Sequence, residues 1–138
     1  MLLVIAIGVV ALRETRTAMR VAVMGASSCE VVNVIDGDTV NTYCPGSGYA
    51  RTRLVGFDTP EVYSPKCLSE YLAGIKATFA LRRVIWGASE SRLVFEGTDR
   101  YGRRLASLFL DGANVSPLMI DAGQGRAYAG GRRGGWCE

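Results

Sequence analysis

The chain has 138 residues, and 49% of them are hydrophobic, which excludes a disordered chain and allows one domain with its own core. The net charge of +3 is a modest excess, but 14 arginines against two lysines suit a phosphate ligand, and equally suit a codon bias toward arginine. The chain has no histidine, so histidine general bases and histidine-bound zinc are excluded, and any hydrolysis must rest on carboxylates, arginines and a metal bound by oxygen.

The chain begins with a wholly apolar run, Met1 to Leu12. As a helix this run would span about 18 Å, well short of the hydrocarbon core of a membrane at about 30 Å. Its size suits the apolar region of a signal peptide, although no basic segment precedes it. We expect residues 1–28 to be an export or membrane-anchoring segment and residues 29–138 to be the folded domain. The alternative is a helix or strand packed on that domain.

Three strands are predicted in the first part of the domain. Residues 30–36 and 39–44 are expected to form a hairpin around Gly37 and Asp38. A turn at residues 45–48 then leads into a third strand over residues 49–57.

One long helix is predicted over residues 68–86, and Gly87 is expected to end it. Apolar side chains recur along it at spacings of four, three and four residues: Leu68, Leu72, Ile75 and Phe79. We expect this stripe to pack in the core.

The last part of the chain predicts a second strand pair and a short helix. Residues 92–96 and 104–110 are the expected strands, with a turn over residues 97–102. Ser116 is expected to cap a short helix that runs to Ala122. The pattern as a whole suits an OB-type barrel, and by itself equally suits another small α+β domain.

The four cysteines are Cys29, Cys44, Cys67 and Cys137, and no two of them form a C-x-x-C pair. An even number in a small domain behind an apolar N-terminus favours disulfides and an oxidising compartment over a zinc site. Cys29 and Cys44 lie at nearly mirror positions about the predicted hairpin turn, which predicts a bridge between them. We expect Cys137 to tie the glycine-rich tail to Cys67.

Two short acidic motifs each follow an apolar, β-branched run: Asp36-Gly37-Asp38-Thr39 and Asp58-Thr59-Pro60-Glu61. Each is therefore expected where a strand meets a turn. Carboxylates held at strand ends, with Arg53 nearby, suit a hard metal ion and a phosphate. Aspartates in such turns can also simply accept hydrogen bonds from their own backbone, and for one isolated motif that interpretation would be favoured.

Three motifs occur in order between about Val31 and Tyr128: IDGDT, R-x-x-x-x-DTPE and DRYGR-x-LA. Together they resemble the staphylococcal nuclease (thermonuclease) family, in its exported bacterial branch. The resemblance implies an α+β fold: an OB-type five-stranded barrel with a long helix after the third strand and a short helix near the C-terminus.

The resemblance also implies roles for particular residues. Ca²⁺ is the expected cofactor, and its ligands are Asp38, Asp58 and the main-chain carbonyl of Thr59. Arg53 and Arg103 would stabilise the transferred phosphoryl group, and Glu61 would act as the general base. Tyr101 is expected to contact the nucleotide, and Asp36 to support the turn.

The function that follows is a Ca²⁺-dependent phosphodiesterase that cleaves DNA and RNA with little sequence preference and leaves 3′-phosphate ends. We expect it to be exported, whether secreted, periplasmic or membrane-anchored through its N-terminus, to prefer single-stranded substrate and to act as a monomer. Two alternatives remain at this point. One is a non-catalytic OB-type module that binds nucleic acid, and the other is a membrane-tethered structural domain whose acidic turns only cap the backbone.

Overall fold

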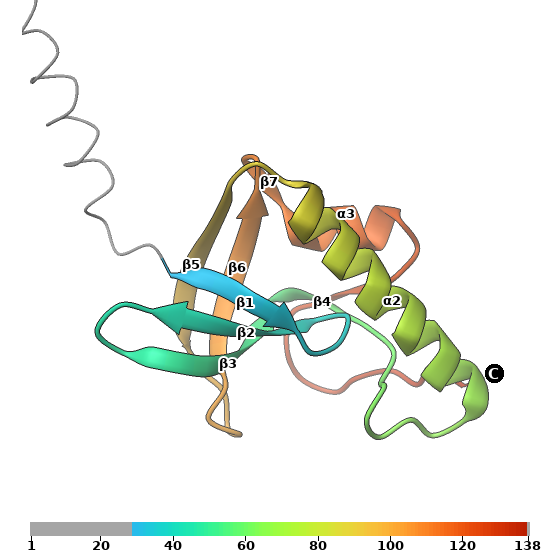
Figure 1. Ribbon diagram of the computed structural model, residues 1–138. Helices are drawn as coiled ribbons and strands as arrows, with labels where there is room; N and C mark the ends of the chain where they lie inside the picture. Colours follow the sequence, from blue (N-terminus) through green and yellow to red (C-terminus); the bar gives the residue numbers. More distant parts are fainter. Residues whose placement is uncertain (1–28, 138) are drawn as a thin grey trace, which may run out of the picture.

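The structure, a computed structural model, describes residues 29–137 (Figure 1). The predicted export or anchoring segment, residues 1–28, lies outside the described residues. Within residues 29–137, no helix has the length and apolar character needed to cross a membrane.

The elements follow one another as β1 (Glu30–Val34), β2 (Thr39–Cys44), β3 (Gly48–Leu54), β4 (Gly56–Asp58), α2 (Leu68–Gly87), β5 (Ser91–Thr98), β6 (Arg104–Leu110), β7 (Ala113–Asn114), α3 (Val115–Asp121) and β8 (Arg126–Tyr128). The main sheet has the order β1-β2-β3-β6-β5, with β7 paired to β6. The β3–β6 ladder is parallel, and the other ladders of this sheet are antiparallel. β4 and β8 form a separate two-stranded antiparallel sheet.

This is the α+β, OB-type arrangement that the sequence predicts, with α2 between the third and fourth strands of the main sheet (Figure 1). β1 and β5, the two ends of the strand order, contact each other. No ladder joins them among residues 29–137, so hydrogen bonds do not close the barrel there.

The predicted third strand, residues 49–57, is divided in the structure. β3 ends at Leu54, and β4 begins at Gly56, whose φ of 97° favours glycine. A Cβ at Gly56 would also lie 2.7 Å from the Ser116 hydroxyl oxygen of α3. The bend moves the chain from the main sheet to the small one, so that Asp58 at the end of β4 lies beside β8.

Two predicted strand ends shift. β1 ends at Val34 rather than at residue 36, because the amides of Ile35 and Asp36 both donate to the Thr39 carbonyl, at 2.9 and 3.2 Å. β5 extends to Thr98, which pairs with Arg104 after an irregularity in the ladder, so the turn begins later than predicted.

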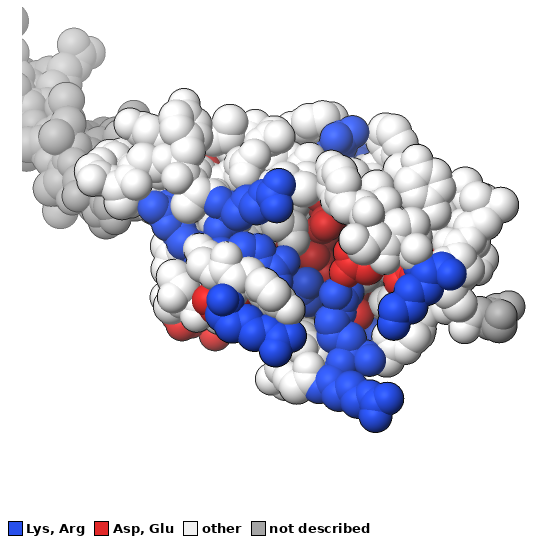
Figure 2. Space-filling view, turned by 90° about the horizontal axis from the view of Figure 1, so that it is seen from below, with Lys and Arg blue, Asp and Glu red and all other residues white. Residues whose placement is uncertain are grey.

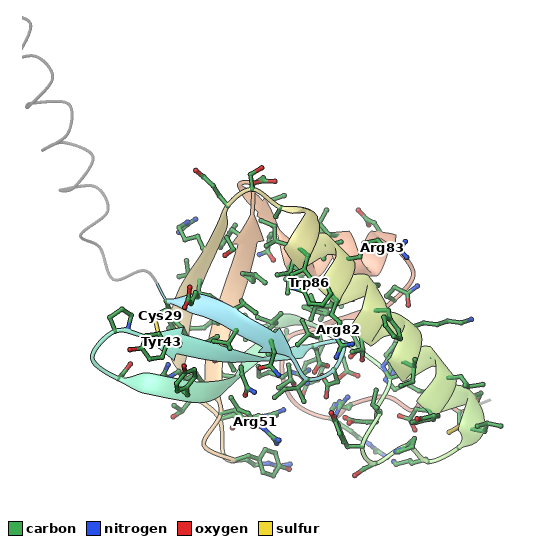
Figure 3. All side chains as sticks on the ribbon, viewed as in Figure 1. Cys29, Tyr43, Arg51, Arg82, Arg83 and Trp86 are labelled. Carbon is green, nitrogen blue, oxygen red and sulfur yellow. A yellow bond between two sulfur atoms is a disulfide. The ribbon has the colours of Figure 1, made fainter. Side chains whose placement is uncertain are left out.

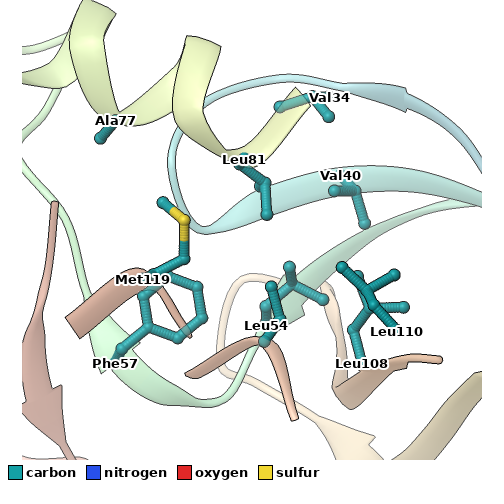
Figure 4. Packing of buried hydrophobic residues seen from close by; sticks show 10 residues of the cluster. Val34, Val40, Leu54, Phe57, Ala77, Leu81, Leu108, Leu110 and Met119 are labelled. Carbon is teal, nitrogen blue, oxygen red and sulfur yellow. The ribbon is translucent and has the colours of Figure 1, made fainter. Parts of the chain in front are cut away.

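The buried core lies between the main sheet and the two helices (Figure 4). Its largest fully buried side chains include Phe57 of β4, Leu54 of β3, Leu81 of α2, Leu108 of β6 and Met119 of α3. Both sheets and both helices therefore contribute to one core, which fixes β4, and with it Asp58, against the main sheet.

The prediction for the apolar stripe of α2 is wrong, although the helix itself is predicted to within one residue. Leu68, Leu72 and Phe79 are 71%, 51% and 58% exposed. The residues of α2 that are buried are instead mostly small or polar: Glu70, Gly74, Ala77, Thr78 and Leu81.

Close approach of the backbone explains this choice of face. A Cβ at Gly74 would lie 2.9 Å from the carbonyl oxygens of Pro60 and Glu61, so the helix rests on the loop through a residue without a side chain. Bulky side chains on that face would push the helix away. They lie outward instead, as Trp86 does with 73% exposure near the end of α2 (Figure 3).

The cap of the short helix also differs from the prediction. Asn114, not Ser116, is the N-cap, and its side-chain oxygen accepts a hydrogen bond from the Ser116 amide at 2.9 Å. Ser116 lies inside the helix and is buried beside Gly56. Asparagine and serine are both good N-caps, so local preference alone did not distinguish them.

Both predicted disulfides are confirmed. Cys29 is bonded to Cys44 across the β1–β2 edge, and Cys67, at the start of α2, is bonded to Cys137. The second bridge joins residues 70 apart in the sequence and brings the C-terminal tail back to the start of α2.

Candidate active site

The two acidic motifs meet in the interior. The Thr59 amide donates to the Asp38 carboxylate at 3.1 Å across a sequence separation of 21 residues. A Cβ at Gly37 would lie 2.6 Å from the Thr59 hydroxyl oxygen, so only glycine permits this approach. Asp38 and Asp58 are 4% and 2% exposed. The contact places both carboxylates at one site.

Local turn chemistry holds Asp38 in place. Its amide donates to the Asp36 carboxylate at 3.1 Å, and the Thr39 hydroxyl donates to its Oδ1 at 3.0 Å. Asp36 thus forms the turn, as the sequence predicts, and leaves Asp38 free to turn inward.

Arg53 lies between the two carboxylates. It is 7% exposed, and its guanidinium is 2.9 Å from Asp38 Oδ2 and 3.3 Å from Asp58 Oδ1. A third hydrogen bond, at 3.2 Å, goes to the Phe57 carbonyl. Arg53 therefore offsets part of the negative charge of the two aspartates predicted to bind the metal.

Burial raises the pKa of Asp38 from 3.8 to about 6, even though Arg53 beside it favours the charged form. The negative charges of Asp36 and Asp58 act in the same direction as burial. A cation close to Asp38 would stabilise the charged form of this buried carboxylate.

Glu61 and the loop after it are held by a residue that the sequence analysis missed. Glu70 of α2 is 4% exposed, and its carboxylate accepts from the Glu61 amide at 3.4 Å and from the Lys66 amide at 2.7 Å. Glu70 lies three residues after the N-cap Cys67, a position from which a Glu side chain can reach back over the start of a helix, and this spacing is the signal that could have found it.

Arg133 and Trp136 of the tail complete the site, and the sequence analysis missed both. The Arg133 guanidinium is 2.5 Å from Asp58 Oδ1, 2.5 Å from Glu61 Oε1 and 3.2 Å from the Thr59 carbonyl oxygen. The Trp136 indole N–H donates to Asp58 Oδ2 at 3.2 Å. The Cys67–Cys137 bridge brings the tail here, but nothing in the sequence distinguishes Arg133 from Arg132.

Arg103 and Tyr101 lie apart from this cluster, on the turn after β5. Asp99 organises that turn: it accepts from the Tyr101 amide at 2.9 Å and pairs with the Arg103 Nε at 2.7 Å. Its hydrogen bonds to Arg103 and Tyr101 hold the pKa of Asp99 below its usual value, against the opposing effect of burial.

A pocket of about 1170 Å³ connects the two groups, and its lining includes Arg53 and Arg133 from the first and Tyr101 and Arg103 from the second. Tyr128 of β8 also lines it, with the Arg53 guanidinium 5.7 Å from its ring centre. Figure 2 shows basic side chains gathered around a hollow in which acidic side chains are visible. The arginines that line the pocket form its basic rim. Behind Arg53 and Arg133 lies the acidic floor, which we define as the cluster that these two arginines contact: Asp38, Asp58, Thr59 and Glu61.

The donor set of the floor fits a hard cation. The Asp58 and Glu61 carboxylates and the Thr59 carbonyl all contact one positively charged group, the Arg133 guanidinium. These ligands are all oxygens, as Ca²⁺ and Mg²⁺ require.

Comparison with known proteins gives one family. The family described as "Staphylococcal nuclease homologue" matches residues 51–134. An uncharacterized protein of Bacillus anthracis is 34% identical over 98 residues, which are 70% of this chain and 45% of that protein. An uncharacterized endonuclease of Haemophilus influenzae is 29% identical over 102 residues, 74% of this chain and 53% of that protein. A succinoglycan biosynthesis protein of Rhizobium meliloti is 33% identical over 96 residues, 66% of this chain and 47% of that protein. The chain thus spans about half the length of the curated relatives it matches.

Proposed function

The chain belongs to the staphylococcal nuclease family, and from that premise we propose that it is a Ca²⁺-dependent phosphodiesterase that cleaves DNA and RNA with little sequence preference. One relative, from Haemophilus influenzae, carries the name endonuclease. We further propose that the protein is exported and monomeric, with residues 1–28 as the export or anchoring segment. The two disulfides suit an oxidising compartment.

The observation that carries the proposal is the buried contact between the two acidic motifs. Asp38 and the Thr59 backbone are joined directly, and Arg53 links Asp38 to Asp58. Aspartates that only cap their own turns have no need to meet in the interior. Buried carboxylates require compensating charge, which a metal and an arginine supply together.

In the proposed reaction, the carboxylates of Asp38 and Asp58 and the carbonyl of Thr59 hold the cation. When bound, Ca²⁺ supplies positive charge to a phosphate oxygen. Glu61 takes a proton from the water that attacks phosphorus in line, and the bond from phosphorus to the 5′-oxygen breaks. The leaving 5′-oxygen takes a proton from solvent and ends as a 5′-hydroxyl, while the other product carries the 3′-phosphate.

The two arginines proposed to bind the phosphoryl group are each paired with a different carboxylate. Arg53 and Arg103 each donate to phosphoryl oxygens, and their fixed positive charges stabilise the transition state more than the ground state. Both are ion-paired in this structure, Arg53 with Asp38 and Arg103 with Asp99. Substrate phosphate would therefore compete with carboxylates for both guanidinium groups.

The pocket supports the proposed substrate. It holds arginines for the phosphate backbone, while Tyr101, 69% exposed, and Tyr128 present aromatic rings. Backbone contacts and base stacking carry no sequence code, which accounts for little sequence preference. Unpaired strands should be cut best, because their phosphates enter a pocket more readily than those of a duplex.

A second candidate is a module that binds nucleic acid without cutting it. Arg133 favours this second candidate, because its guanidinium is ion-paired with Asp58 and with Glu61, the proposed base. In that function the basic rim would hold the strand and the acidic floor would stay blocked.

The test is degradation of heat-denatured DNA by the full chain, with excess Ca²⁺ or with a chelator. Glu61→Gln is compared with Glu30→Gln, which removes the same charge at an exposed position on β1. We expect cleavage that needs Ca²⁺ and falls about 10²- to 10⁴-fold in Glu61→Gln alone. Binding of the DNA without cleavage by the unmodified protein would favour the second candidate, and cleavage that survives Glu61→Gln would reject Glu61 as the base.

A further inference from the structure

The C-terminal tail, residues 129–137, lies over the acidic floor and is held there by contacts of its own. We propose that this tail is a built-in plug: Arg133 occupies the cation site, so a divalent metal must displace it, and the Cys67–Cys137 bridge keeps the displaced tail nearby. The inference rests on the proposed function, because it takes the acidic floor to be the metal site.

The contacts of Arg133 are those of a substitute cation. Its guanidinium binds Asp58 Oδ1 and the Thr59 carbonyl, two of the three groups proposed to hold the metal. It also binds Glu61 Oε1, the proposed base. A metal at these oxygens and a guanidinium on the same oxygens exclude each other.

The charges lead to the same conclusion. Asp38, Asp58 and Glu61 carry three negative charges, and Arg53 carries one positive charge among them. Arg126 lies at the edge of the cluster, 4.0 Å from Asp58 Oδ2, and its side chain is 44% exposed, so solvent screens its charge. Arg133 offsets one of the two charges that remain, whereas a divalent ion offsets both. With the ion and Arg133 both in place the cluster would be positive, so binding of the ion favours departure of Arg133.

The tail is fastened beyond Arg133 as well. Arg126 of β8 donates to the carbonyls of Gly135 at 2.9 Å and Gly134 at 3.0 Å, and its guanidinium lies 3.6 Å from the ring centre of Trp136. The disulfide follows at Cys137. Side-chain contacts of Arg126 and a disulfide, rather than a strand ladder of its own, therefore hold the tail segment around Arg133.

The tail can nevertheless move. The Arg133 side chain is 35% exposed, and ion pairs of partly exposed side chains are individually weak. Gly130 and Gly131 precede it with φ of 100° and 84°, so the backbone there tolerates a wide range of conformations. Reduction of the disulfide by a dithiol, which gives two cysteine thiols and an oxidised dithiol, would release the far end of the tail.

The first measurement is Ca²⁺ affinity by calorimetry, for the full unmodified chain, Arg133→Gln and Arg132→Gln. The control removes the same charge from the exposed neighbouring residue. We expect the dissociation constant to fall about tenfold in Arg133→Gln and to change less than about twofold in Arg132→Gln. An equal affinity in all three proteins overturns the proposal.

The second measurement follows the tail without using activity. The two tryptophans are Trp86 and Trp136, so Trp86→Phe leaves Trp136 as a single fluorescent reporter on the plug. Trp86 is exposed on α2 and takes no part in the site (Figure 3). We expect saturating Ca²⁺ to change the emission of Trp136, and an unchanged emission overturns the proposal.

The third measurement tests the tether. Replacing Cys67 and Cys137 together by serine should raise Ca²⁺ affinity as Arg133→Gln does, and adding Arg133→Gln should then have little further effect. Replacing Cys29 and Cys44 by serine is the control and should leave the affinity unchanged. If every protein binds Ca²⁺ equally and cleaves DNA, only the plug is wrong. If none binds Ca²⁺ and none cleaves DNA, the plug and the proposed function both fail.

Discussion

Arg53 and Arg133 are the two arginines that lie closest to Asp58, and different parts of the molecule hold them. Arg53 lies on β3, is 7% exposed and contacts Asp38 and Asp58 from within the main sheet. Arg133 contacts Asp58 from a tail without regular structure, and its side chain is 35% exposed. The difference separates a charge that is buried in the fold from one that lies on a partly exposed tail, which is the charge we propose a ligand displaces.

The largest expected effect is the difference between these two arginines in how much each contributes to the free energy of unfolding. Arg53→Gln leaves two buried carboxylates without their shared partner, which should lower the free energy of unfolding by about 3–5 kcal/mol. Arg133→Gln removes a partly exposed ion pair and should change it by about 1 kcal/mol or less. Urea unfolding in chelator measures both, and equal losses would contradict the distinction between sheet and tail.

The two disulfides offer the next comparison. The Cys29–Cys44 bridge closes a loop of 15 residues and the Cys67–Cys137 bridge one of 70. Chain entropy assigns them roughly 3 and roughly 4 kcal/mol, so replacing Cys67 and Cys137 by serine should lower the stability more. Thermal unfolding at matched pH measures the losses. A larger loss at Cys29 and Cys44 would mean that the sheet edge depends on its bridge more than the tail does.

A third prediction concerns pH and the part of the site held by the sheet. The pKa of Asp38 is raised to about 6 in the folded protein from 3.8, so the folded state binds more protons than the unfolded chain between these values. The contribution of Asp38 to stability in chelator is therefore lost as the pH rises from about 4 to about 6.

Asp38→Asn isolates this contribution from the other titrating groups. Subtracting its unfolding free energy from that of the unmodified protein at pH 4, 5, 6 and 7 should give a difference that falls as the pH rises. A difference that is independent of pH would show that Asp38 titrates normally.

The smallest expected effect lies in the tail. Trp136→Phe keeps an aromatic ring and removes the hydrogen bond to Asp58, so the free energy of unfolding should fall by about 1 kcal/mol. Phe at Trp86 is the matched control on α2 and should have a smaller effect. If Trp136→Phe lowers the free energy of unfolding as much as Arg53→Gln does, the tail unfolds together with the rest of the domain.

Much of the site was predictable because its signals are local. The two acidic motifs predict strand ends and turns, and the structure brings the motifs together through the contact of Asp38 with Thr59. The metal, base and phosphate roles stay predictions, and so does the nucleotide contact of Tyr101. These roles concern Asp38, Asp58, Thr59, Glu61, Arg53 and Arg103.

The apolar stripe on α2 is an example of a feature that local sequence patterns did not predict correctly. Its periodicity predicted the helix but not the buried face, because Gly74 and Glu70 pack against the loop of Glu61 in a way that only the assembled chain creates.

By itself the sequence determined the order of most strands and of both helices, the Cys29–Cys44 pairing and the positions of the acidic turns. These features follow from neighbouring residues, through side-chain periodicity, turn chemistry and the symmetry of a hairpin. Tertiary structure alone decided that Arg133, and not Arg132, lies on Asp58 and Glu61. That contact joins segments more than 70 residues apart, and it depends on where a disulfide and Arg126 fasten a flexible glycine-rich tail.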